Sequence, residues 1–316
     1  MDKRRLVLDA MDGKGVPRAP GSFWFHFSGE EAEGEACVRA HLNYYRESGI
    51  DFVKVMSDGF SYSLSIEPKE ASDWRRLKAL GPKSRFIRGQ IERAKRVVDE
   101  IGGETCVFYN VFAPFSLMRQ CAGDAAVMGH LREDREAVVG ATRVIAEDVA
   151  ELATALIAEA GCTGIYLALQ GGELYRFSAE EYRAIVSPSD LAVLSAANAR
   201  SGYNIAHLCG WAGDRNRLEV WKDYPAKVFN WAIFVEGVDI AAGRGLFPGK
   251  TLMGGFDNRK VGLLYGGSDE TIASFTRDLV EKNGRLGYMV GADCTLPADV
   301  DRRRVKVVMD ALKASE

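Results

Sequence analysis

The stretch Thr105–Gly172 decides the fold, because it contains a complete strand–helix–strand pattern. It opens with TCVFY (Thr105–Tyr109), continues through HLREDREAVVGATRVIAEDVAELATALIAEA (His130–Ala160) and ends with GIYLA (Gly164–Ala168) and the turn after it. The two short runs are apolar and rich in β-branched or aromatic residues, which is typical of strands buried on both faces of a parallel sheet. The long segment places apolar residues at steps of three and four, and Gly161 follows as a stop signal. We therefore predict one helix over 130–160 between two parallel strands.

The same alternation runs through the whole chain. Eight short apolar runs recur, at 22–26, 52–56, 105–109, 164–168, 203–207, 227–231, 250–254 and 287–290. Further helical patterns cover 35–48, 83–100, 178–186, 190–201, 269–282 and 299–314. Parallel strands need crossover helices, and a closed barrel leaves no sheet edge, so we predict an α/β fold, a (β/α)8 TIM barrel, as a single domain over 1–316. A doubly wound open sheet is the alternative, but the first turn, FSGEE (Phe27–Glu31), lacks a phosphate-binding glycine pattern.

Composition excludes several classes of protein. The 316 residues carry 41 basic and 44 acidic side chains, a net charge of −3, which argues against a nucleic-acid binder. No run approaches the roughly 20 apolar residues of a membrane span, and the charged N-terminus is not followed by a signal-like apolar run. Six cysteines occur without a CxxC pair, as expected of thiols in a reducing compartment. We expect a cytoplasmic protein without membrane or nucleic-acid partners.

Polar side chains follow nearly every predicted strand, where barrel enzymes build their active sites. These strand-end residues are His26, Asp58, Asn110, Gln170, His207, Asn230 and Asp257. Asp58 is either a ligand or substrate anchor or the N-cap of a helix. Asp257 is more simply explained as a cap of the following turn. The other positions are candidates for contact with a substrate.

His207-x-Cys209 is the most specific feature of the sequence. Residues i and i+2 of an extended segment point to the same side, so an imidazole and a thiolate converge. Cys294 follows the last predicted strand, which a barrel brings within reach across its mouth. Three nitrogen and sulfur ligands with an open fourth position are typical of a catalytic zinc site, whereas a buried histidine beside a buried cysteine is the structural alternative. Water, Glu236 and Asp293 are all open as a fourth ligand.

Several segments together carry a family resemblance that covers nearly the whole chain. They are KRRLVLDAMDG (Lys3–Gly13), VPRAP (Val16–Pro20), DFVKVMSD (Asp51–Asp58), FAPF (Phe112–Phe115), the long helix ending at Gly161, the HxCG segment, and MGGFD (Met253–Asp257). With these the chain resembles the uroporphyrinogen decarboxylase superfamily, and within it the zinc-dependent methylcobalamin:thiol methyltransferases of coenzyme M type. Those enzymes carry zinc on an HxC motif and a distant cysteine, which His207, Cys209 and Cys294 match. The context DCTLP (Asp293–Pro297) is similar to their Cys-small-x-Pro ending.

The resemblance implies a zinc-dependent corrinoid methyltransferase that moves a methyl group between a corrinoid and a small thiol or other methyl donor or acceptor. It implies a Zn²⁺ cofactor, methylcobalamin as co-substrate, and catalytic roles for the three ligands and Asp58. We assign contact with substrate or corrinoid to His26, Asn110, Gln170, Asn230 and Asp257. No histidine lies in a DxHxxG-type corrinoid-binding context, so the corrinoid arrives on a separate protein or as free cobalamin. A homodimer is compatible with this assignment.

The alternative within the superfamily is a metal-free uroporphyrinogen decarboxylase-type enzyme. Asp58 matches the aspartate with which those enzymes hold pyrrole NH groups. Their arginine-rich segment after the first strand is missing, however, and FSGEEAE (Phe27–Glu33) stands there with the wrong charge for a polycarboxylate. A non-catalytic corrinoid or tetrapyrrole binder is a third possibility, against which the intact ligand triad argues. Methyl donor, acceptor and reaction direction stay open.

Overall fold

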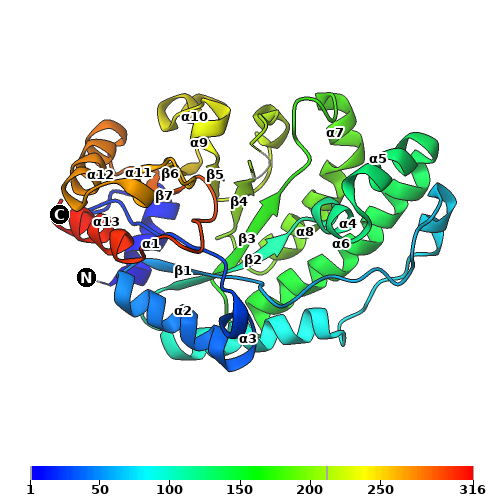
Figure 1. Ribbon diagram of the computed structural model, residues 1–316, viewed down its shortest axis with the longest axis horizontal. Helices are drawn as coiled ribbons and strands as arrows, with labels where there is room; N and C mark the ends of the chain where they lie inside the picture. The colour runs from blue at the N-terminus through cyan, green and yellow to red at the C-terminus, as the bar shows by residue number, and fades with distance from the viewer. Residues whose placement is uncertain (1, 211–212, 316) are drawn as a thin grey trace.

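The computed structural model describes residues 2–210 and 213–315, and a seven-stranded parallel sheet forms its centre (Figure 1). Each strand pairs with the next one along the chain. The strands are β1 (Phe52–Val55), β2 (Cys106–Phe112), β3 (Gly164–Leu169), β4 (Ile205–Leu208), β5 (Val228–Trp231), β6 (Thr251–Phe256) and β7 (Tyr288–Ala292). All seven are parallel, as predicted from the near-continuous apolar runs.

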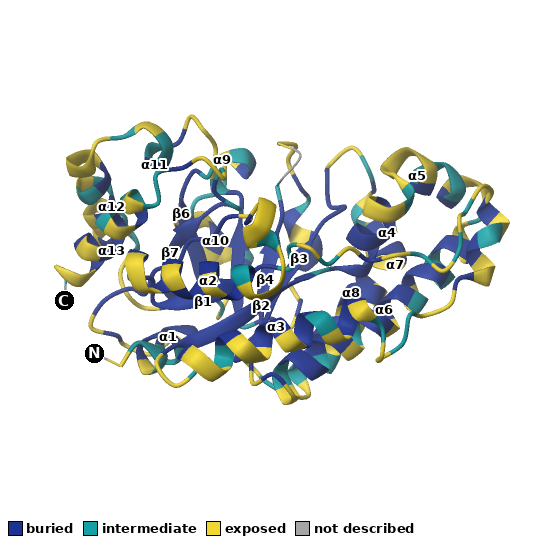
Figure 2. Ribbon diagram, turned by 60° about the horizontal axis from the view of Figure 1, so that its bottom comes forward, coloured by how far each residue is buried: buried dark blue, intermediate teal, exposed yellow. Residues whose placement is uncertain are grey.

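The sheet curls around a core of its own. Every strand contributes at least one side chain to a single buried cluster, which includes Phe52, Phe108, Tyr166, Ile205, Val228, Met253 and Met289. Side chains of alternate residues point to opposite faces of a strand, so these seven mark the inner face of the sheet. Figure 2 shows the strands buried along nearly all of their length, while the helices around them expose their outer faces. The result is an α/β half-barrel with a packed interior.

Helices surround the sheet (Figure 1). They are α1 (Lys3–Met11), α2 (Gly34–Ser48), α3 (Arg85–Ile101), α4 (Pro114–Ala122), α5 (Asp124–Glu133), α6 (Arg135–Ala158), α7 (Ala179–Ile185), α8 (Ser187–Asn198), α9 (Ile233–Glu236), α10 (Ile240–Leu246), α11 (Leu263–Gly266), α12 (Asp269–Asn283) and α13 (Arg303–Lys313). Helix α1 differs from the rest, because it contacts β1, β2 and β7 and its apolar residues join the inner cluster. No helix among the described residues is long and apolar enough to cross a membrane.

The prediction of a closed eight-stranded barrel is wrong in one respect. The run 22–26 forms no strand, and only single bridges link Gly21 to Val290 and Phe25 to Leu296. Toward β1, one backbone bond, from the Asp51 N–H to the Gly21 carbonyl at 2.9 Å, is joined by two side-chain bonds: the Asp51 carboxylate accepts the Gly21 N–H at 2.9 Å, and Ser22 Oγ donates to the Phe52 carbonyl at 2.7 Å. The segment therefore lies between β7 and β1 and fills the gap without regular pairing.

The predicted helix over 130–160 is also divided. Helix α5 ends at Glu133 and α6 begins at Arg135, with a non-helical Asp134 between them. The Asp134 carboxylate accepts the Ala137 N–H at 3.0 Å and also binds Arg75. An aspartate that caps the second helix in this way competes with continued helical hydrogen bonding. The apolar stripe alone gave no sign of this break.

Candidate metal centre

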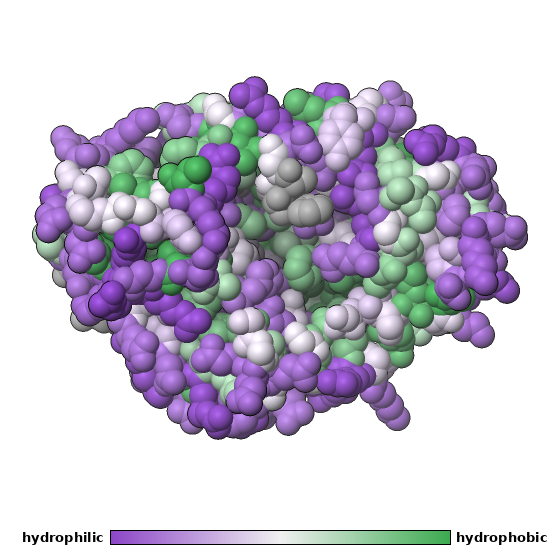
Figure 3. Space-filling model, viewed as in Figure 1, coloured by the Kyte–Doolittle hydropathy of each residue, from purple (hydrophilic) through white to green (hydrophobic). Residues whose placement is uncertain are grey.

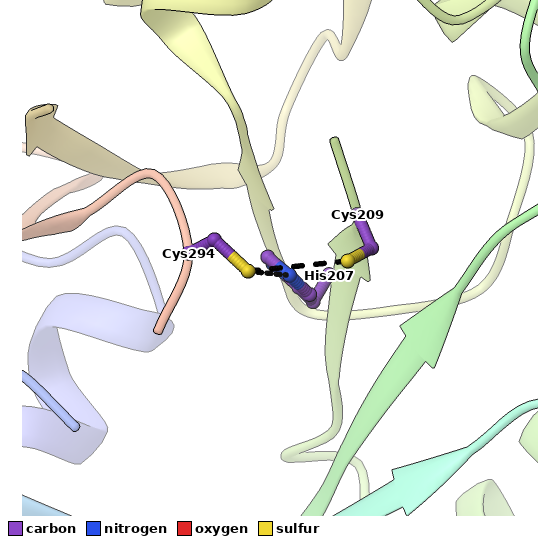
Figure 4. Close-up of side chains that lie close together, drawn as sticks. All are labelled: His207, Cys209 and Cys294. Carbon is purple, nitrogen blue, oxygen red and sulfur yellow. Dashed lines mark hydrogen bonds between the residues drawn. The ribbon is translucent and has the colours of Figure 1, made fainter. Parts of the chain in front are cut away.

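Three side chains from two distant segments converge at the carboxyl end of the sheet. His207 lies in β4 and Cys209 directly follows it, while Cys294 lies two residues beyond the end of β7 (Figure 4). The Cys294 Sγ is 3.5 Å from His207 Nε2 and 3.9 Å from Cys209 Sγ. All three potential ligand atoms lie within 4.8 Å of one another. The inward alternation of β4 thus aims His207 and Cys209 at the same point.

The neighbouring strand fixes the orientation and tautomer of His207. Asn230 pairs with His207 in the register of β4 and β5, and its Oδ1 lies 2.6 Å from His207 Nδ1. The Asn230 Nδ2 donates to the carbonyls of Met253 and Ala292, at 3.0 and 3.1 Å, so Oδ1 must be the acceptor. His207 Nδ1 therefore carries the proton, and Nε2 presents its lone pair to the two sulfurs. Such a partner on the far ring nitrogen is the usual support of a metal-ligating histidine.

The electrostatics of the cluster favour thiolate. The hydrogen bond from Cys209 lowers the pKa of Cys294 well below its usual range, against the opposing effect of burial, and a hydrogen bond with His207 and the ammonium group of Lys54 add to the lowering. Gln170 Nε2 lies 3.8 Å from Cys209 Sγ, as a further donor to sulfur. A thiolate is the form of cysteine that binds metal.

The residues fit a zinc ion. One imidazole nitrogen with a free lone pair and two sulfurs are borderline and soft donors, which zinc prefers. Among the described residues this is the group of histidine, cysteine and acidic side chains close enough to hold a metal. Three ligands leave one position of a tetrahedron for a substrate, which is the arrangement of catalytic zinc sites.

A cavity of about 280 Å³ opens onto the three side chains. Figure 3 shows the surface hollowed near the middle of the face seen in Figure 1. The lining residues are His26, Lys54, Met56, Asn110, Phe112, Gln120, Ala168, Gln170, His207, Cys209, Cys294 and Thr295. The predicted contacts His26, Asn110 and Gln170 are thus beside the triad, in a cavity sized for a small molecule.

Asp58 lies in an adjoining cavity of about 310 Å³, which shares Asn110, Phe112 and Gln120 with the first. Its carboxylate oxygens lie 2.6 Å from His26 Nδ1 and 2.9 Å from the Phe27 N–H. Asp58 therefore holds the chain that follows the run 22–26. It lies in the cavity next to the one that contains the triad.

The remaining candidates lie apart from the cavity. Asn230 is fully buried behind His207, so its contacts are with the imidazole and not with the cavity. Asp257 binds the Arg259 guanidinium and lines a different cavity. Of the two candidate fourth ligands, Glu236 accepts two bonds from Asn216, and Asp293 accepts the Phe234 N–H at 2.8 Å.

Sequence reasoning missed Lys54 and Tyr166. Lys54 lines the cavity from β1, and the Tyr166 hydroxyl donates to Asn230 Oδ1 at 2.7 Å. A lysine in the middle of the buried run FVKVM was the available signal for the first. The role of Tyr166 depends on strand register, for which no single residue gave a signal.

Comparison with known proteins agrees with the fold. Residues 56–315 match the family described as Uroporphyrinogen decarboxylase (URO-D). The chain belongs to this family. A methyltransferase from Methanosarcina mazei has a similar structure, with a TM-score of 0.79 at 15% identity over 99% of both chains. A B12-independent methionine synthase from Shewanella sp. W3-18-1 has a TM-score of 0.60 at 14% identity, over 94% of this chain and 93% of that one.

A putative vitamin-B12 independent methionine synthase from Listeria monocytogenes is also similar, with a TM-score of 0.57 at 11% identity, over 94% of this chain and 98% of that one. Among the curated proteins, none matches the sequence. At these identities the structural likeness concerns the fold, and the function must be argued from the site.

Proposed function

We propose that this protein is a zinc-dependent methyltransferase that moves a methyl group between a corrinoid and a small thiol. The observation that carries the proposal is the convergence of His207 Nε2 with the sulfurs of Cys209 and Cys294 beside a small cavity. The similar fold of the Methanosarcina mazei methyltransferase supports it. Zinc, when bound by these three side chains, supplies a Lewis acid that keeps a substrate thiol deprotonated at neutral pH.

The chain's own residues orient the site. Asn230 holds His207 with Nε2 toward the sulfurs, and Gln170 donates to Cys209. The cavity walls position the substrate sulfur for in-line attack, which contributes to catalysis by proximity. The thiol proton leaves to solvent. A sulfur lone pair then forms the bond to the methyl carbon, and the methyl–cobalt bond breaks with its electron pair left on cobalt(I).

A metal-free decarboxylase is less well supported by the cavities. A porphyrinogen with several carboxylates needs several cationic partners, because a desolvated unpaired carboxylate costs several kcal/mol. Among the residues that line the two adjoining cavities, Lys54 is the one lysine or arginine side chain. The chemistry of these described walls suits a smaller and less charged substrate.

Metal analysis and optical turnover assays test the proposal together. We expect about one zinc per chain, and conversion of methylcobalamin to cobalt(I) corrin in the presence of small thiols, followed by absorbance. Cys294→Ser should lose most of the metal and the turnover, because serine is a poor zinc ligand at neutral pH. Cys121→Ser, which changes an exposed thiol outside the triad, is the matched control and should keep both. Turnover that survives Cys294→Ser undiminished would contradict the proposal.

A further inference from the structure

Lys54 is a lysine inside the barrel. It lies in the middle of β1, between Phe52 and Met56, and both neighbours at i±2 belong to the inner cluster. Because side chains alternate along a strand, Lys54 also points inward. Lys54 is 5% exposed, yet it lines the cavity that contains His207, Cys209 and Cys294. A charged side chain at this position calls for a reason beyond packing.

The surroundings of the ammonium group are aromatic. Its Nζ lies 4.0 Å from the centroid of the Tyr166 ring and 4.5 Å from that of Trp24. Within the described residues, Lys54 has no hydrogen bond and no ion pair with a carboxylate. Two ring faces stabilise a cation only in part, and lysine is almost never fully buried unless it is paired. Burial lowers the pKa of Lys54 to about 7, while Cys294, Cys209 and Asp58 oppose this shift.

The acidic groups around Lys54 come from three elements. Cys209 follows β4, Cys294 follows β7, and Asp58 follows β1. The Asp58 carboxylate is engaged by His26 and by the Phe27 N–H. Cys209 and Cys294 are the other two groups that raise the pKa of Lys54, and both line the same cavity as Lys54. When zinc takes the Nε2 lone pair while Nδ1–H donates to Asn230, His207 is a neutral imidazole and adds no positive charge to the cavity.

The net charge of the site explains why a cation is needed beside it, and this inference rests on the proposed zinc site. A divalent ion with two thiolates and a neutral imidazole has no net charge, and a third thiolate from the substrate makes the group negative. A buried negative charge is costly unless a cation lies nearby. We propose that Lys54 is a positioning residue whose ammonium group is the counter-ion that lets the substrate bind as a thiolate beside His207, Cys209 and Cys294.

The test compares Lys54→Met with the wild-type protein, both loaded with Co²⁺ in place of zinc. Methionine is unbranched and of similar length, so it can occupy the same space between the rings. Binding of 2-mercaptoethanol, which is neutral, and of 3-mercaptopropionate, which is anionic, is followed by the sulfur-to-cobalt absorption band. Lys95→Met removes one exposed charge on α3 and is the matched control.

Lys54→Met should bind Co²⁺ at the wild-type ratio but both thiols about tenfold more weakly or worse, as loss of a nearby charge in a partly buried site predicts. The pH at which half of the neutral thiol is bound should rise by about one unit. The variant should also unfold at a higher temperature than wild type, because an ammonium group no longer has to be buried; this result shows that it is folded. Lys95→Met should change none of these values.

Unchanged affinity for the neutral thiol would overturn the counter-ion role. Weakening confined to 3-mercaptopropionate would also overturn it, because Lys54 would then anchor an anionic tail of the substrate. Wild-type protein that binds no Co²⁺ would refute the proposed function, and this inference with it. Wild-type protein that binds Co²⁺ and thiols, with Lys54→Met indistinguishable from it, would refute only the inference.

Discussion

Replacing Asn230 with alanine removes a hydrogen-bond partner of His207 and leaves all three proposed metal ligands unchanged. The Asn230 side chain accepts from His207 Nδ1 at 2.6 Å and from the Tyr166 hydroxyl at 2.7 Å, and it donates to the carbonyls of Met253 and Ala292. With Asn230→Ala, the imidazole loses the bond that selects its tautomer and ring orientation. Loss of such a partner typically weakens metal binding by about 10–100-fold.

Stability falls with the same change. Two buried donors, the Tyr166 hydroxyl and His207 Nδ1, lose their acceptor, and an unsatisfied buried donor costs about 1–3 kcal/mol. We therefore expect a loss of about 2–6 kcal/mol in the free energy of unfolding of the metal-free protein. Because lost stability alone can lower an apparent metal affinity, the experiment needs a control with the same stability defect.

Asn204→Ala supplies that control. Asn204 is also fully buried, accepts from the Ile165 N–H at 2.9 Å and donates to Asn198 and Ser201, but it lies at the amino end of β4, away from the triad. Zinc affinity, measured by competition with a chromophoric chelator, should fall in Asn230→Ala and stay at the wild-type value in Asn204→Ala. Equal zinc affinity in all three proteins would refute the argument that Asn230 orients the ligand.

Two further substitutions test a buried carboxyl group and a closely packed glycine. Burial raises the pKa of Asp190 to about 7, against the hydrogen bonds from Tyr224 and Tyr182, so this carboxyl favours folding at low pH and loses that contribution as the pH rises through about 7. Asp190→Asn should therefore raise the melting temperature more at pH 8 than at pH 5, and an equal rise at both would contradict this. A Cβ on Gly172 would lie 2.2 Å from the Trp221 ring, so Gly172→Ala should cost about 1–3 kcal/mol in denaturant unfolding. Gly103→Ala, which meets nothing within 4 Å, should show no such loss.

Prediction from the sequence worked best where a local residue pattern is compatible with only one kind of structure. Apolar runs gave seven of the eight predicted strands, because strands buried on both faces leave few alternatives to a parallel sheet. It failed at Asp134 and at 22–26, where a side chain replaces backbone pairing: a capping carboxylate in the first case, and Asp51 and Ser22 in the second. Hydrophobic periodicity indicates which face of a helix or strand is apolar. It does not indicate where a side chain competes for backbone hydrogen bonds.

The same limit applies to the site. The spacing His207-x-Cys209 predicted a shared direction, because alternation along a strand is local. Strand register decided what the sequence could not: that Asn230 faces His207, and that Tyr166 lies on the inner face of the sheet. These polar residues occupy inner positions that apolar side chains would otherwise fill, so the barrel interior is specialised around the triad at some cost in core packing.

The position of Cys294 follows from the irregular segment 22–26. Hydrogen bonds bracket this cysteine on both sides: the Asp293 N–H donates to the Phe256 carbonyl, and the Leu296 N–H donates to the Trp24 carbonyl, each at 2.9 Å. The second bond needs a Trp24 carbonyl that regular pairing has not already used. An eighth strand fully paired with β7 and β1 would compete for that carbonyl. The missing strand and the third ligand are therefore linked, because the bond between Leu296 and Trp24 holds the chain after β7 where Cys294 reaches His207 and Cys209.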